Sequence, residues 1–322
     1  MPSPSGHPSM TVAQPRLPLT WRALDWLEAV VAWLWPSSRK AWTPYLLLLP
    51  AVLVVGTLMV GLVVLADNSL RIVDRDTFML GDEYSLGNYA EIVARPFFLT
   101  VFGRSLWGAL LTTICTLVLA FPYAYVMVRT PSSTLRKLLL FSLFLPFFIG
   151  QVVRAYGWLI VLGQEGMINN LLTVIGLERT RLLYNFPAVV AGLTQYMLPF
   201  AVLLLSPAIV AIGEDLETAS ASLGADWPRT FWHIVLPLAA PGIVGACVVV
   251  FTISLTDFAI PAIMGGGKSD FMANLIYSAF FNITDSGLGS ALSLILVFVG
   301  STVFAVFYAL VGLRASSRTA AP

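Results

Sequence analysis

The chain has 322 residues and a formal net charge of +1; 58% of its residues are hydrophobic and only 11% are charged. Soluble domains carry about 25% charged residues, so this composition excludes an ordinary soluble protein and indicates a membrane protein. The net charge gives no sign of a nucleic-acid partner, and no basic patch with interleaved aromatic residues suggests one, so none is expected.

The N-terminal region differs from the rest of the chain. Residues 1–20 are rich in Pro, Ser and Thr, which predicts a disordered tail. Residues 21–35 alternate apolar and charged residues, and five of the nine tryptophans fall between Trp21 and Trp42. Tryptophan favours the membrane interface, so we expect a helix lying on the bilayer, within a cytoplasmic region of residues 1–43. A signal peptide is disfavoured, because charges interrupt the apolar stretch and a small-residue cleavage site is missing.

Six segments approach or exceed the roughly 20 apolar residues that a helix needs to cross a bilayer. They predict an all-α bundle of six transmembrane helices over residues 44–314, followed by a cytoplasmic tail of residues 315–322. The predicted spans are Pro44–Ala66, Ser105–Val128, Leu138–Leu162, one within Asn185–Gly213, Leu238–Met264 and one within Ser286–Leu313.

The charges in the loops predict the orientation of these spans. An even number of spans places both termini on one side. The loop Arg129–Lys137 has three cations and no acid, whereas Asp67–Arg104 has six acids. Because cations favour the cytoplasmic side, both termini and the loop after the fourth span are expected in the cytoplasm.

Metal and nucleotide signals are weak in this sequence. The two cysteines lie in apolar runs, and neither histidine has a partner at metal-ligand spacing, so no metal site is expected. The run Gly265–Ser269 resembles the end of a phosphate-binding loop, but Ala262 stands where that pattern requires a glycine, and no strand precedes it. We interpret the run as an external turn and expect no cofactor on this chain.

The polar segment Glu214–Ile243 is the clearest functional signal. Apolar residues recur at helical spacing up to Leu223, and Gly224 follows where a helix would end in a left-handed residue. Asp226 is placed to cap a second helix, whose apolar stripe includes Phe231 and Ile234. The pattern predicts two short helices around one glycine, held between spans as a docking surface.

This segment resembles the cytoplasmic EAA loop of permease subunits in binding-protein-dependent ABC importers. That loop has Glu-Ala-Ala, a glycine six residues after the Glu, and then Ile-x-Leu-Pro. Here Thr218-Ala219-Ser220 precede Gly224, Glu217 lies one position before the family's Glu, and Ile234 to Pro237 match fully. The resemblance implies that residues 214–237, the EAA-like loop, contact an ATPase. The residues it assigns to coupling are Glu217, Thr218, Ala219, Leu223, Gly224, Phe231, Ile234, Leu236 and Pro237.

The resemblance extends over about residues 84–310. Tyr84–Tyr89, Leu145–Trp158, Gly166–Asn170 and Asp257–Gly266 are similar to the first permease of spermidine/putrescine importers, a subfamily that includes iron and opine or amino-acid-derivative systems. It implies the type I importer permease fold in the inner membrane and transport of a small, cationic solute. The implied partners are a second homologous permease, favouring a heterodimer, two ABC ATPase subunits that bind ATP and Mg²⁺, and a periplasmic substrate-binding protein.

Two charges lie within predicted spans, Arg154 and Asp257. Charges inside a membrane are costly and usually mark a pathway, although these two could instead pair with each other or with polar neighbours. Asp257 would suit a cationic substrate, and aromatic rings also attract cations. The candidate substrate pathway consists of Asp257, Arg154, Gln151, Tyr156, Trp158 and Gln195.

Two other classes of function remain as alternatives. An ATPase-independent secondary transporter could use Asp257 as a proton or ion relay, but it would have no need of the EAA-like loop. A membrane enzyme would need a nucleophile and base, or a metal site, and the sequence shows no such group. The chain is therefore expected to be a transport subunit rather than an enzyme.

Overall fold

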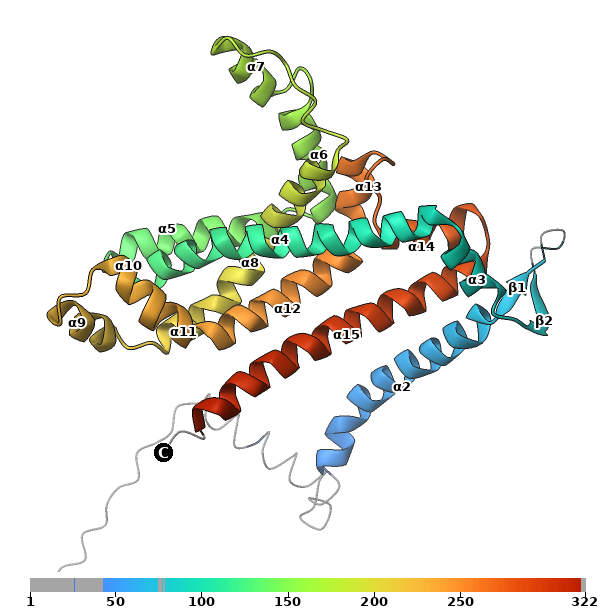
Figure 1. Cartoon of the computed structure of the whole chain (residues 1–322), viewed down its shortest axis with the longest axis horizontal. Coiled ribbons are helices and arrows are strands. Elements are labelled where there is room, and N and C mark those ends of the chain that lie inside the picture. The colour runs from blue at the N-terminus through green and yellow to red at the C-terminus, as the bar shows by residue number, and fades with distance from the viewer. Residues whose placement is uncertain (1–25, 27–42, 75–76, 78, 320–322) are drawn as a thin grey trace, which may run out of the picture. The chain divides into compact units, whose positions relative to one another are not determined.

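The computed structural model describes residue 26 and residues 43–74, 77 and 79–319 (Figure 1). Apart from Trp26 and Thr43, the predicted N-terminal tail and interfacial helix lie outside the described residues. Two compact units meet in sequence within helix α2 (Thr43–Ser69): the first ends at Val63, and the second contains every element after α2.

Helices make up most of the second unit, and a short hairpin adds to them. Strands β1 (Arg71–Val73) and β2 (Leu80–Tyr84) pair antiparallel. The elements that follow are α3 (Gly87–Ala94), α4 (Pro96–Arg129), α5 (Ser133–Phe144), the 3₁₀ turn η2 (Leu145–Phe148), α6 (Gln151–Leu162), α7 (Met167–Val174), α8 (Phe186–Val210), α9 (Glu214–Ser222), α10 (Trp227–Thr230), the π-helical turn η3 (Phe231–Val235), α11 (Leu236–Leu238), α12 (Ala240–Thr256), α13 (Ala259–Gly265), α14 (Met272–Tyr277), the π-helical turn η4 (Ser278–Asn282) and α15 (Ser286–Thr319).

Four helices of the described chain are individually long and apolar enough to cross a membrane: α2, α4, α8 and α15. They correspond to the first, second, fourth and sixth predicted spans. Two further spans are possible if bent helix pairs count as one span each, which gives up to six. The apolar lengths thus confirm where the chain can cross a bilayer.

The structure corrects the bounds of the third and fifth predicted spans. In place of Leu138–Leu162, Ser133–Phe148 and Gln151–Val174 meet at 101°. Pro146 precedes this break and Gly150 lies in it, and proline cannot donate the hydrogen bond that would continue a helix. In place of Leu238–Met264, Trp227–Leu238 and Ala240–Thr256 meet at 68°, and α12 ends at Thr256.

The helices α4, α8 and α12 pack side by side and form the centre of the second unit (Figure 1). Ala120 and Ala124 on α4 and Ala201 on α8 are fully buried at this centre. Small side chains let helix backbones approach closely, which favours helix association inside a bilayer. Ala109 of α4 belongs to a second buried cluster, together with Phe251 of α12 and Leu292 of α15. As a result, α4 connects the two clusters.

Candidate functional site

The EAA-like loop has the helix–glycine–helix form that the sequence predicts. Gly224 has φ +82°. The N–H of Ala225 donates to the Ser220 carbonyl (3.1 Å) and that of Gly224 to the Ala221 carbonyl (3.0 Å), the paired bonds of a Schellman motif that ends α9. Asp226 then begins α10, because its side chain accepts a hydrogen bond from the Arg229 N–H (3.3 Å). Local sequence signals therefore determine this turn.

The second helix of the loop is not a regular α-helix. After α10 the backbone widens into the π-helical turn η3 and then continues as α11. Pro237 has no N–H to donate to the preceding turn, which accounts for the local widening. Pro241 likewise weakens the junction at Ala239, where the helix bends into α12. The loop is thus attached to α12 through two proline-containing turns.

The residues predicted to couple to an ATPase fall into two groups. Thr218, Ala219, Leu223 and Gly224 are exposed, and Leu223 has 89% of its surface accessible. The second group is half-buried against the rest of the unit: Glu217, Phe231, Ile234, Leu236 and Pro237. The first group can meet another protein, whereas the second holds the loop to its own chain.

Glu217 shows this division most clearly. Its Oε1 accepts hydrogen bonds from Nη2 (2.7 Å) and Nε (3.0 Å) of Arg129, the last residue of α4. Its Oε2 accepts a hydrogen bond from the Tyr125 hydroxyl (2.6 Å). The carboxylate is directed inward and is fully occupied within the chain. Sequence reasoning missed both partners, because they lie in a span about 90 positions earlier.

The candidate pathway residues meet where α6, α8 and the end of α12 come together. Gln151 donates through Nε2 to Oδ2 of Asp257, and Trp158 Nε1 lies 3.5 Å from Gln195 Oε1. Arg154 lies over the ring of Tyr196, 5.0 Å from its centroid. Five of the six predicted residues are therefore brought to neighbouring helix faces.

The structure does not place Tyr156 with the other five residues, and it does not pair Arg154 with Asp257. Tyr156 is exposed and makes no side-chain hydrogen bond or ring contact within the described chain. Arg154 and Asp257 form no ion pair there either. Asp257 is buried, and its Oδ1 accepts a hydrogen bond from the N–H of Ile260 (2.9 Å), in the first turn of α13. Asp257 thus has polar partners without Arg154, and Arg154 has a ring but no carboxylate.

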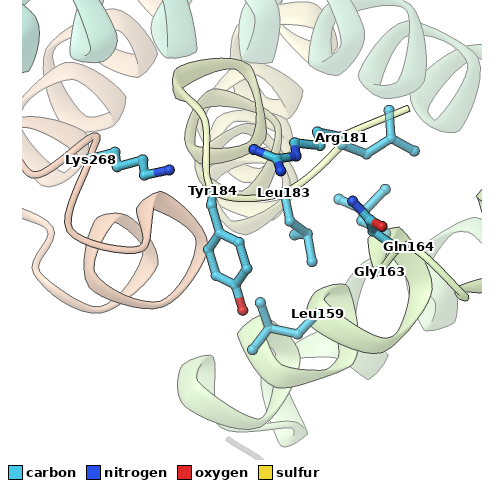
Figure 2. A pocket seen from close by; sticks show the side chains of 9 residues that line it. Leu159, Gly163, Gln164, Arg181, Leu183, Tyr184 and Lys268 are labelled. Carbon is cyan, nitrogen blue, oxygen red and sulfur yellow. The ribbon is translucent and has the colours of Figure 1, made fainter. Parts of the chain in front are cut away.

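A cavity of about 460 Å³ lies at the C-terminal end of α6 (Figure 2). Arg181 and Lys268 border it, and within the described residues neither side chain makes a hydrogen bond or ion pair. Gly163 also lines it, nine residues and so about 13 Å along the chain from Arg154. The cavity therefore combines free positive charge with proximity to the candidate pathway.

Two loops build the cationic side of this cavity. Tyr184 has φ +58°, an uncommon conformation for a residue with a side chain, and its N–H donates to the Met264 carbonyl (3.0 Å). Its ring lies directly against Gly266, leaving no room for a side chain there. Nearby, burial raises the pKa of the Asp270 carboxyl, and the Arg104 guanidinium acts in the opposite direction. The loops are thus fixed to each other.

The fold and the EAA-like loop define a class of protein, the membrane subunit of an ABC importer. Residues 128–317 match the family described as binding-protein-dependent transport system inner membrane component. The spermidine/putrescine transport system permease protein PotB of Salmonella typhimurium (strain SL1344) is 34% identical over 227 residues, which cover 70% of this chain and 78% of PotB.

Other similar proteins have names that give other substrates. The molybdenum transport system permease protein ModB of Mycobacterium bovis (strain ATCC BAA-935 / AF2122/97) is 30% identical over 216 residues, 66% of this chain and 79% of ModB. Among solved structures, a bacterial ABC transporter involved in the import of the acidic polysaccharide alginate matches with a TM-score of 0.69 at 18% identity, covering 86% of this chain and 97% of that one. The chain belongs to the family of binding-protein-dependent inner membrane permeases and has the type I importer fold.

Proposed function

We propose that this permease subunit carries a small amine, such as putrescine, spermidine or a related amino-acid derivative, into the cytoplasm. ATP hydrolysis on two partner ATPases, which hold the ATP and Mg²⁺, drives the transport. A second homologous permease completes the membrane domain as a heterodimer, and a periplasmic binding protein delivers the substrate. Both termini and the EAA-like loop lie in the cytoplasm. The 34% identity to PotB supports the amine assignment.

The observation that carries the transport pathway is a pair of helix breaks bonded to each other. One break separates η2 from α6 at Ile149–Gly150, and the other separates α12 from α13 at Asp257–Phe258. The bond between Gln151 and Asp257 joins them. Irregular backbone at membrane depth is tolerated where it is buried in protein or lines a water-filled cavity. The joined breaks support a substrate pathway at this position.

Alternating access follows from this arrangement. The exposed residues of the EAA-like loop dock on the ATPase, so closure of the ATPase pair displaces the loop. The helices α4, α8 and α12 pack together and move with it, which shifts the pathway between inward-facing and outward-facing states. Substrate and nucleotide bias the populations of the two states.

A second substrate class is favoured by the positive charges. Arg181 and Lys268 border the cavity near α6, and Arg154 has no carboxylate partner within the described chain. Cations repel a polyamine but attract a substrate that carries a carboxylate. A zwitterionic amino-acid derivative or opine is therefore the alternative cargo.

The test is to purify the tagged chain from its native membrane in mild detergent, identify the co-purifying chains, and reconstitute the complex with its binding protein. We expect an ABC ATPase and a second permease, and uptake of putrescine or spermidine that requires ATP. Uptake of amines that carry a carboxylate, without uptake of putrescine or spermidine, would favour the zwitterionic amino-acid derivative or opine as the substrate. Recovery of the chain without any ATPase, together with ATP-independent uptake, would favour a secondary transporter and refute the proposal.

A further inference from the structure

The EAA-like loop is bonded to the last two turns of α4, where a largely buried ion pair is the main contact. The side chains of Arg129 and Glu217 are only 13% and 18% exposed. Arg129 Nη2 also donates to the Ile212 carbonyl (2.6 Å), just beyond the end of α8. One guanidinium therefore joins α4, the end of α8 and α9. A cation at this position also complements the negative C-terminal end of α8.

Tyr125, one turn earlier on α4, extends the connection to the second helix of the loop. The Tyr125 hydroxyl donates to Glu217 (2.6 Å). The oxygen of this hydroxyl also accepts a hydrogen bond from Trp227 Nε1 (3.4 Å). The Tyr125 and Trp227 rings meet edge to face with centroids 6.0 Å apart. Both α9 and α10 are thus connected to the same end of α4.

Few other side-chain bonds hold α9. Within the described residues, Ser220 and Thr230 share a hydrogen bond (2.8 Å), but this bond stays inside the loop. Glu214 lies 4.0 Å from Arg129 and is largely exposed, so it adds little. Glu217 is therefore the residue of α9 whose side chain is firmly bonded to a span. On its N-terminal side, α9 is joined to α8 through the backbone of residues 211–213.

We propose that Arg129 and Glu217 form a positioning joint that makes α4 follow the EAA-like loop, so that movement of the ATPase reaches α4 directly. The inference rests on the proposed function. In this largely buried ion pair, two N–H groups of Arg129 donate to one carboxylate oxygen of Glu217. The pair resists separation, because either partner alone would be left as an uncompensated charge. The 34 residues of α4 form a lever about 51 Å long that packs against α8 and α12. Glu217 acts on coupling through Arg129 and does not itself need to touch the ATPase.

The test compares substrate uptake with ATP hydrolysis in the complete reconstituted complex. For Glu217→Gln and for Arg129→Gln we expect uptake to fall by about tenfold or more, while ATP hydrolysis stays within about threefold of wild type. Tyr125→Phe removes the hydroxyl, with its hydrogen bonds to Glu217 and Trp227, but leaves the ion pair and the ring in place, so a smaller loss of about two- to fivefold is expected. Glu178→Gln is the matched control, since its carboxylate is exposed, makes no hydrogen bond or ion pair within the described chain and lies outside the EAA-like loop; it should couple normally.

A double-mutant cycle distinguishes a joint from two separate effects. If the two residues act as a unit, Arg129→Gln with Glu217→Gln loses no more uptake than the worse single variant, since the double change leaves no lone buried charge. The joint would be overturned if the double variant lost about a hundredfold in uptake, the product of the two single losses. It would also be overturned if uptake and ATP hydrolysis fell together, or if either single variant no longer bound the ATPase. Wild-type complex without ATP-driven uptake would instead refute the proposed function.

Discussion

Replacing Gly224 with valine tests whether the turn between α9 and α10 controls coupling. Gly224 has φ +82°, and a Cβ added there would meet nothing within 4 Å. A Cβ at this position meets no atom of the described chain, so the expected loss comes chiefly from the backbone conformation. An L-residue in the left-handed region costs about 1–2 kcal/mol, which lowers the population of this turn by a factor of roughly 5–30.

The assay is ATP-driven uptake by the reconstituted complex, with membrane insertion measured separately. We expect Gly224→Val to lower uptake by about 5- to 30-fold with normal insertion, and Gly224→Asn to lower it less, because asparagine tolerates this conformation. Gly176→Val is the matched control: Gly176 also has φ +82° and open space, but it follows α7, away from the EAA-like loop. Normal uptake by Gly224→Val, or an equal loss in Gly176→Val, would refute the reasoning.

Two further predictions concern a helix cap and a helix contact. Asp226→Ala removes the side chain that accepts the Arg229 N–H, so α10 should lose about 1 kcal/mol of stability, measured as faster amide exchange in that helix. Gly242→Ala would place its Cβ against that of Ala208 where α12 crosses α8, whereas Gly245→Ala on the same helix meets nothing within 4 Å. We expect a lower unfolding temperature for Gly242→Ala and no change for Gly245→Ala. Equal unfolding temperatures for both variants would contradict the close contact between Gly242 and Ala208.

The positions of the apolar segments and the turn of the EAA-like loop could be predicted from the sequence. A bilayer of fixed thickness requires helices of a minimum length, so α2, α4, α8 and α15 are visible as long apolar runs. Gly224 and Asp226 act on residues within four positions of themselves, and such local rules need no knowledge of the fold. The resemblance to importer permeases rests on the same short-range pattern.

The bends and the side-chain partners depended on the tertiary structure. Proline and glycine near residue 150 are visible in the sequence, but they permit a break of 101° without specifying it. Glu217 meets Arg129 across 88 positions, and Asp257 meets Gln151 across 106. A charged residue within an apolar segment indicates only that its side chain needs a polar or oppositely charged partner. Which partner it finds, and whether it faces another protein or its own chain, is decided by helices that pack together from distant parts of the chain.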